Sequence, residues 1–124
     1  MSEVKGIGND IVEIARIRQS IERHGHHFLS RLFTQKEQDY CYKFQDPAPH
    51  FAGHFAAKEA IAKALGTGFG EHLAWHDVDI MHDELGKPIV HLSTTAKERF
   101  KSMQVLISIS HDTHYATAVA IATH

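Results

Sequence analysis

Two carboxylates, Asp10 and Glu59, have neighbours that could let them take part in chemistry. Residues 4–12 have the composition of a strand, and the alternation of side chains places Asp10 on the same face as Gly6 and Gly8. Two glycines on that face leave room for a ligand, or for another backbone, to come close to the carboxylate. The acid three residues further on also gives Asp10 the spacing of a helix cap, which is the simpler interpretation.

Glu59 belongs to an alanine-rich segment, one helical turn after Phe55 and one turn before Lys63. An aromatic residue on the same flank predicts a partly buried carboxylate. The alternative is a surface ion pair between Glu59 and Lys63, which would contribute only about 0.3–0.5 kcal/mol to stability. For an isolated glutamate that alternative is preferred, so the rest of the sequence has to decide.

Lys58, Lys63 and the turn Gly66-Thr67-Gly68 have residue types that suit phosphate binding. Two ammonium groups beside a glycine-flanked hydroxyl can hold phosphate oxygens. The turn can equally be a simple helix end, where glycine is common. The GxxxxGK[ST] spacing of a P-loop is not present, so the sequence does not support nucleotide triphosphatase chemistry.

The elements that must position these residues follow from the spacing of apolar side chains. The segment 50–65 is predicted to be a long helix that ends at Gly66, and shorter helices are predicted before it, up to Gly25 and after a capping box at Thr34 and Glu37. Another short helix is expected to begin with a capping box at Thr95, and strands are predicted at 4–12, 75–82, 89–92, 105–110 and 115–122. We therefore expect an α+β fold, with a long helix and shorter helices packed on a largely antiparallel sheet.

Composition limits the classes of protein that fit the chain. Its 124 residues, 43% hydrophobic and 23% charged, predict a single domain over 1–124. A net charge of −2 argues against a nucleic-acid-binding surface, and no apolar run approaches the ~20 residues that cross a membrane. The single cysteine, Cys41, cannot form an internal disulfide, which agrees with a cytoplasmic protein.

Two other kinds of function fit parts of the sequence. The twelve histidines include the pairs His50/His54 and His72/His76, each four residues apart, which would suit a histidine-rich metal-binding protein. Neither an HExxH motif nor a cysteine pair completes such a site. A non-catalytic binding module is the other alternative, because Arg16 and Arg23 share the solvent face of the first helix and could hold an acidic partner.

Taken together, the motifs resemble one family across essentially the whole chain. They are Gly-Ile-Gly-Asn-Asp-Ile-Val-Glu-Ile-Ala-Arg-Ile at 6–17, Phe-Ala-Ala-Lys-Glu-Ala at 55–60, Lys-Ala-Leu-Gly-Thr-Gly at 63–68, Asp-Glu-Leu-Gly-Lys-Pro at 83–88, and Ser-Ile-Ser-His at 108–111. Their order and spacing are similar to those of the holo-acyl-carrier-protein synthases. The resemblance implies the 4′-phosphopantetheinyl transferase fold. It also implies transfer of 4′-phosphopantetheine from coenzyme A to a serine of apo acyl carrier protein, in support of fatty acid biosynthesis.

The resemblance also implies roles for particular residues. The family binds Mg²⁺ through the acids that match Asp10 and Glu59, and such hard oxygen ligands are the ones that Mg²⁺ prefers. Lys63 would steady the phosphoryl oxygens, while the general base is left open between a carboxylate and a metal-bound water. Coenzyme A is expected to contact the residues Lys58, Lys63, Gly66, Thr67, Gly68, Ser110 and His111.

The remaining expectations concern partners. Arg16 stands at the position with which the family contacts acyl carrier protein, and geometry adds Arg23 to that docking face. The family also implies a homotrimer with active sites between subunits. The chain departs from the family at His54, where an arginine is common; the mostly neutral side chain puts a phosphate contact there in doubt.

Overall fold

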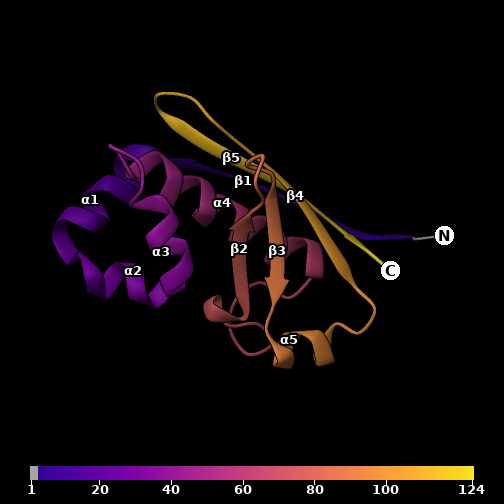
Figure 1. The fold of residues 1–124 in the computed structure, drawn as a ribbon. Coiled ribbons are helices and arrows are strands. Elements are labelled where there is room, and N and C mark those ends of the chain that lie inside the picture. The colour runs from indigo at the N-terminus through magenta and orange to yellow at the C-terminus, as the bar shows by residue number, and fades with distance from the viewer. Residues whose placement is uncertain (1–2) are drawn as a thin grey trace.

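A computed structural model describes residues 3–124 as helices and antiparallel strands (Figure 1). The strands are β1 (Val4–Glu13), β2 (Val78–His82), β3 (Pro88–Leu92), β4 (Gln104–His111) and β5 (Tyr115–Thr123). The helices are α1 (Ile14–His24), α2 (His26–Leu32), α3 (Gln35–Cys41), α4 (Ala48–Leu65) and α5 (Thr94–Arg99), with a 3₁₀ turn at Trp75–Asp77. One sheet has the order β1-β5-β4, and β2 pairs with β3 in a second sheet. The α+β class with a largely antiparallel sheet is confirmed.

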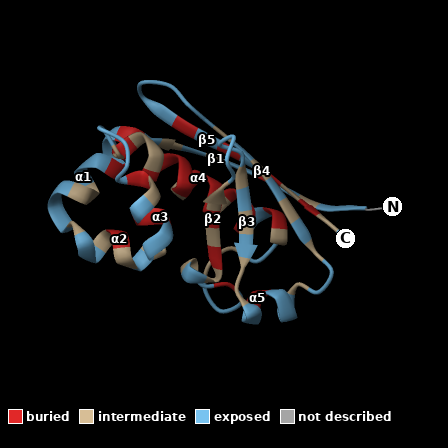
Figure 2. Cartoon of the chain, in the orientation of Figure 1, coloured by how far each residue is buried: buried red, intermediate tan, exposed pale blue. Residues whose placement is uncertain are grey.

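Helix α4 lies across one face of the β1-β5-β4 sheet and is buried along most of its length (Figure 2). Small residues allow this close approach. A Cβ atom on Gly6 would collide with the carbonyl oxygen of Ala64, and one on Gly8 would collide with that of Ala60. Strand β5 presents only buried alanines to the same side, at positions 116, 118, 120 and 122. The room that the two glycines leave beside Asp10 is therefore filled by the backbone of α4.

A second apolar cluster joins α1, α2 and α3 to the first half of α4. Its fully buried side chains include Phe33, Cys41 and Phe51, and Ile14 and Leu29 are each 2% exposed. Burial raises the pKa of the Cys41 thiol, so this single cysteine is held as a neutral thiol. Among residues 3–124, no helix is both long enough and apolar enough to cross a membrane.

Local capping is confirmed in one helix and corrected in another. The Thr34 hydroxyl accepts a hydrogen bond from the Glu37 N–H at 3.2 Å, and the Glu37 carboxylate accepts one from the Thr34 N–H at 2.8 Å. The predicted capping box of α3 is therefore present. The cap expected at Thr95 is wrong, because the Ser93 hydroxyl accepts from the Ala96 N–H at 3.1 Å and begins α5 earlier.

Three further expectations for the elements need correction. Asp10 is not a helix cap, since it lies within β1 and α1 begins after Glu13. The strand expected over 75–82 is shorter at its start, where a 3₁₀ turn precedes β2. Helix α2 was not anticipated, because Gly25, which has a φ of 51°, separates it from α1 by a single residue.

A buried ion pair ties α3, α4 and β2 together. The Lys58 ammonium donates hydrogen bonds of 2.7 Å to the Glu37 carboxylate and to the Leu32 carbonyl oxygen, and both charged side chains are fully buried. The Ile80 N–H donates to the other carboxylate oxygen at 3.1 Å. Burial would raise the pKa of Glu37, but contact with His54 and the charge of Lys58 outweigh it and lower the pKa. Glu37 is therefore a buried carboxylate anion whose partners come from three elements.

Removing one member of this pair should destabilise the fold, because the other charge would be left buried without a partner. We expect Glu37→Gln to lower the free energy of unfolding by about 3–5 kcal/mol. Glu37→Gln combined with Lys58→Met should recover a large part of that loss. Urea unfolding of the three proteins measures both effects. If the free energy of unfolding of Glu37→Gln stays within about 1 kcal/mol of that of the parent protein, Glu37 is not the buried, paired anion described above.

Candidate functional site

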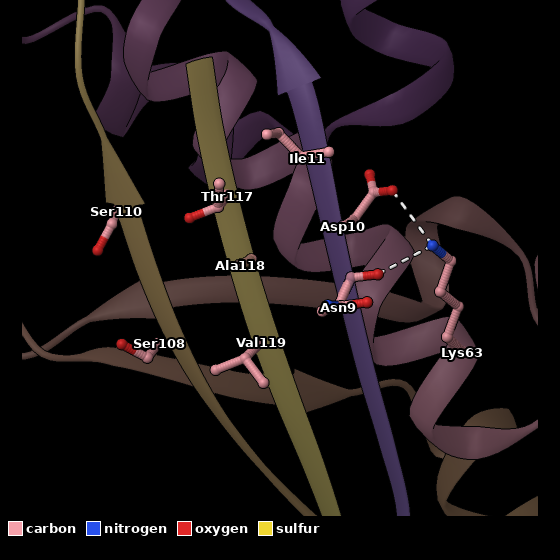
Figure 3. Close-up of a pocket in the computed structure, with 9 residues that line it drawn as sticks. All are labelled: Asn9, Asp10, Ile11, Lys63, Ser108, Ser110, Thr117, Ala118 and Val119. Carbon is pink, nitrogen blue, oxygen red and sulfur yellow. Dashed lines mark hydrogen bonds and ion pairs between the residues drawn. The ribbon is translucent and has the colours of Figure 1, made fainter.

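Asp10 and Lys63 face each other across the contact between β1 and α4 (Figure 3). The Lys63 ammonium lies 3.3 Å from the Asp10 carboxylate and donates a hydrogen bond of 2.9 Å to the Asn9 carbonyl oxygen. Both side chains line a cavity of about 540 Å³ beside the outer face of the sheet. The Ser108 and Ser110 side chains line the same cavity from β4. The cavity thus has one acid, one cation and three hydroxyl groups, the third from Thr117 on β5.

Asp10 also lines a second cavity, of about 400 Å³, on the side of α1. Glu59 lies on this side, together with Arg16 and the aromatic residues Phe28 and Phe55. Burial raises the pKa of Glu59, and the negative charge of Asp10 raises it further, while Lys63 opposes the shift. The two acids are therefore close enough to repel each other, and Asp10 belongs to both cavities.

The pair of acids has the chemistry of a site for a hard cation. A divalent ion beside Asp10 and Glu59 would relieve their mutual repulsion, and Mg²⁺ is commonly held by one or two carboxylates together with substrate phosphate. Among residues 3–124, no three histidine, cysteine or acidic side chains are grouped so that they could share a metal ion. Two carboxylates alone would leave the other coordination positions of such an ion to water and substrate oxygens.

Lys58 does not belong to this site, and its expected contact with coenzyme A is corrected here. Its ammonium is fully buried and is used by Glu37 and the Leu32 carbonyl oxygen. The phosphate-binding motif placed Lys58 and Lys63 together, but they lie on different faces of α4, and only Lys63 is exposed. Helical spacing separates these faces, since five residues correspond to about 1.4 turns.

The turn after α4 has the role of a helix end in this structure. Gly66 has a φ of 85°, and the N–H groups of Gly66, Thr67 and Gly68 all donate to the carbonyl oxygen of Ala62. The Thr67 hydroxyl donates to the Gly68 carbonyl oxygen at 2.9 Å. Because these donors are already used within the cap, contact of the three residues with a phosphate stays a prediction.

His111 lines a third cavity, of about 160 Å³, rather than the cavity of Ser110. Histidines 50, 54 and 82 line this third cavity as well. His54 is only 2% exposed, so the departure from the family pattern places a buried imidazole at this position. Ser110 and His111, which one motif predicted together, thus line two different cavities.

Arg16 and Arg23 of α1 are both exposed, but only Arg16 lines the cavity that contains Glu59. Arg23 lies near the end of the helix. A third arginine, Arg18, was not singled out from the sequence, and it holds Asp46 through two hydrogen bonds of 2.8 and 3.1 Å. This exposed pair connects α1 to the loop before α4, and only the fold brings the two residues together.

Phe28 is a lining residue that the sequence did not indicate. It lies on α2, the helix that was not predicted, and it lines the second cavity together with Phe55. Phe55 was noted only as the neighbour of Glu59 along the helix. Its ring stacks on Trp75 at a centroid distance of 5.5 Å, and this contact fixes one wall of the cavity.

Comparison with known proteins agrees with this geometry. Residues 6–120 match the model of the 4′-phosphopantetheinyl transferase superfamily. A holo-[acyl-carrier-protein] synthase of Protochlamydia amoebophila is 54% identical over 116 residues, which cover 94% of this chain and 95% of the relative. One from Chlamydia pneumoniae is 49% identical over 120 residues, covering 97% and 98% of the two chains.

Solved structures give the same result. The crystal structure of Helicobacter pylori holo-[acyl-carrier-protein] synthase in complex with coenzyme A has a TM-score of 0.87 and 37% identity, and the match covers 94% of this chain and 98% of that one. The enzyme from Neisseria meningitidis has a TM-score of 0.88 and 32% identity, with coverage of 97% and 98%. The chain therefore belongs to the holo-[acyl-carrier-protein] synthase family of the 4′-phosphopantetheinyl transferase superfamily.

Proposed function

We propose that this chain transfers the 4′-phosphopantetheine group of coenzyme A to a serine hydroxyl of an apo acyl carrier protein. The serine oxygen forms a bond to the phosphorus that carries pantetheine, and the bond from that phosphorus to the bridging oxygen breaks. The bridging oxygen leaves with adenosine 3′,5′-bisphosphate, and the serine proton passes to a base. The observation that carries the proposal is the position of Asp10, whose side chain lines two adjoining cavities where two substrates could meet.

Each cavity has the residues that one substrate needs. Arg16 lines the cavity beside α1, and an exposed cation there suits an acidic carrier protein. Lys63, Ser108 and Ser110 line the other cavity, where an ammonium group and hydroxyl groups can donate to phosphate oxygens. We therefore assign the α1 side to the carrier protein and the sheet side to the pyrophosphate of coenzyme A.

Asp10 and Glu59 would hold a Mg²⁺ ion in this proposal. When bound, the metal would polarise a phosphoryl oxygen and offset negative charge that develops during transfer. Lys63 would bring a second positive charge to the phosphoryl oxygens, and the Asn9 carbonyl oxygen already orients its ammonium group. Phe55 and Phe28 would limit the access of water from the α1 side.

The outer face of the β1-β5-β4 sheet supports the proposal of a trimer. Large apolar side chains on this face are exposed, including Ile7 at 69%, Ile11 at 63% and Leu106 at 57%. Such a contiguous apolar face is typical of an interface between subunits. Ile11 also lines the cavity of Lys63, so a neighbouring subunit on this face would help to close the coenzyme A site. A cytoplasmic location and a role in fatty acid biosynthesis stay predictions.

Single substitutions Asp10→Ala and Glu59→Ala should each lower turnover by about 100-fold or more, because the charge stabilisation by one metal depends on both acids. The double variant should be little worse than either single one. The mass gain of an apo acyl carrier protein, followed over time at saturating Mg²⁺, measures turnover. Glu13→Ala, an exposed acid at the end of β1, is the matched control. Losses that multiply in the double variant would rule out a shared metal.

Charge reversal at Arg16 should affect the carrier protein far more than coenzyme A. We expect Arg16→Glu to raise the KM for the carrier about tenfold or more at low salt, because the reversed charge repels an acidic partner, and to leave the KM for coenzyme A nearly unchanged. Added salt should shrink the difference. Lys101→Glu makes the same charge change at an exposed site after α5 and should have little effect. Equal changes in both constants would contradict a docking role.

An acidic residue on the outer sheet face should prevent assembly. We expect the parent chain to sediment with the mass of three chains, and Ile7→Glu to sediment as a single chain with much lower activity. Leu85→Glu is a suitable control, since Leu85 is 96% exposed on the turn between β2 and β3. A parent protein that is monomeric at micromolar concentration would show that this face is not a subunit interface.

A further inference from the structure

Two imidazole rings meet between α4 and the end of β2. The Nε2 atoms of His54 and His82 lie 3.0 Å apart, which is a hydrogen-bond distance. Tyr40 stacks on the His82 ring at a centroid distance of 3.9 Å and an interplanar angle of 5°, so the ring is held in a fixed orientation. His54 is 2% exposed and lies on the buried face of α4. The contact is therefore covered by an aromatic side chain and by the helix, and both rings also line the third cavity.

The outer nitrogen of each ring also faces an oxygen atom. His82 Nδ1 lies 3.3 Å from the carbonyl oxygen of Gly86, in the turn between β2 and β3. His54 Nδ1 lies 3.4 Å from the Glu37 carboxylate, an ion-pair distance, and has no hydrogen-bond partner among the described residues. A protonated His82 Nδ1 can donate to the Gly86 carbonyl oxygen, and a protonated His54 Nδ1 would face the Glu37 anion, whereas a bare ring nitrogen would turn its lone pair toward an oxygen atom in either place.

Counting protons gives the charge of the pair. The two outer nitrogens take one proton each, and the Nε2···Nε2 hydrogen bond needs a third. Two neutral histidines carry only two protons, so three protons mean one positive charge on the pair. With fewer protons one of the contacts is lost, and with four protons the two Nε2–H groups would point at each other. The geometry is thus complete only in the singly charged form.

We propose that His54 and His82 share one extra proton, and that this proton fastens the turn between β2 and β3 to helix α4. The turn is stiff within itself, because the Asp83 carboxylate accepts hydrogen bonds of 2.9 Å from the N–H groups of both Leu85 and Lys87. The hydrogen bond between His82 and His54 therefore connects this stiff turn to α4 through the Gly86 contact. Gly86, in that turn, lines the cavity that His111 lines.

Geometry favours the extra charge on His54, because its Nδ1 lies 3.4 Å from the Glu37 carboxylate. Burial lowers the pKa of His82, and the neighbouring His54 lowers it further, which opposes the contribution of the Gly86 carbonyl oxygen. His82 is therefore the ring that stays neutral, and the positive ring lies beside the Glu37 anion. The ionisable groups beside the pair are Glu37 and Tyr40 from α3, His50 from α4, Asp83 from the turn and His111 from β4. Cys41 from α3, Lys58 from α4 and Asp79 from β2 act on the pair only through Glu37 and Lys58.

Ring and backbone resonances of the free protein test the proposal directly. In an NMR titration from pH 5 to 9, we expect the rings of His54 and His82 to change with a common midpoint, since they titrate as one unit. The Gly86 and Lys87 amide signals should move at that same midpoint because the turn is released with the proton. Independent midpoints for the two rings, or turn amides that do not follow them, would overturn the proposal.

Stability supplies a second test, with His82→Phe as the variant that keeps a ring against Tyr40. In this variant His54 has lost its Nε2 partner and needs only the proton at Nδ1. Above neutral pH the folded parent would hold one proton more than its unfolded chain, so its stability should fall as pH rises. The unfolding constant of the parent should increase by up to about tenfold per pH unit relative to His82→Phe.

Below pH 6 the two stability curves should be parallel, because both folded proteins then hold one proton fewer than their unfolded chains. His91→Gln, which removes an exposed histidine of β3, should follow the parent at every pH. Parallel curves for the parent and His82→Phe up to pH 9 would overturn the shared proton. If His82→Phe does not fold, the ring titration of the parent protein still decides.

The consequence for the cavity rests on the proposed function. Coenzyme A affinity measured by calorimetry should weaken from pH 6.5 to pH 8.5 by up to about tenfold more for the parent than for His82→Phe. Absence of coenzyme A binding at every pH would contradict the proposed function and leave the ring titration unaffected. Binding with the same pH dependence in both proteins would contradict the positioning role of the pair.

Discussion

The close approach of β1 to α4 is the constraint on which the rest of the structure depends. It exists because Gly6 and Gly8 have no side chain where the carbonyl oxygens of Ala64 and Ala60 pass. Only at this separation can the Lys63 ammonium reach both the Asn9 carbonyl oxygen and the Asp10 carboxylate. The alanines of β5 extend the same contact across the sheet. The glycines therefore do not open space for a substrate; they let a helix bring its functional flank to the edge of a strand.

A second organising point is the buried carboxylate of Glu37. The same residue caps α3, receives the ammonium of Lys58 from α4 and accepts the Ile80 N–H from β2. Its oxygen next to His54 continues the chain of contacts toward His82 and the turn beyond it. One anion thus holds α3 and β2 against α4, the helix that also carries Glu59. The fold separates a rigid polar core from the exposed polar site at Asp10.

The sequence predicted most elements because their signals are local. The spacing of apolar residues gave α4 and the strands, and the pair Thr34 and Glu37 gave a true capping box. Errors occurred where two signals lay one or two residues apart. Ser93 and Thr95 are both acceptable caps, and packing of Ala96 in the core selects the first. A single glycine between α1 and α2 likewise made one long helix followed by a loop a reasonable expectation.

Residues of the site could be predicted only where members of one sequence motif also lie together in the folded chain. Motifs alone grouped Lys58 with Lys63. The ion-pair partner of Lys58 is Glu37, which lies 21 residues earlier in the chain, so no local pattern could indicate the pair. The shared position of Asp10 between two cavities and the pairing of His54 with His82 also depend on contacts over 28 to 53 residues. Such contacts are properties of the fold rather than of a segment.

The burial of Cys41 has a practical consequence for work on this protein. The chain contains one cysteine, and its thiol lies fully within the cluster under α1 to α3, where burial raises its pKa. A buried neutral thiol reacts slowly with alkylating reagents, because the thiolate is the nucleophile. A cysteine introduced at an exposed position, such as Leu85, would therefore be the one readily labelled group on the native protein. Fluorescent or spin labels could then be attached without first removing the natural residue.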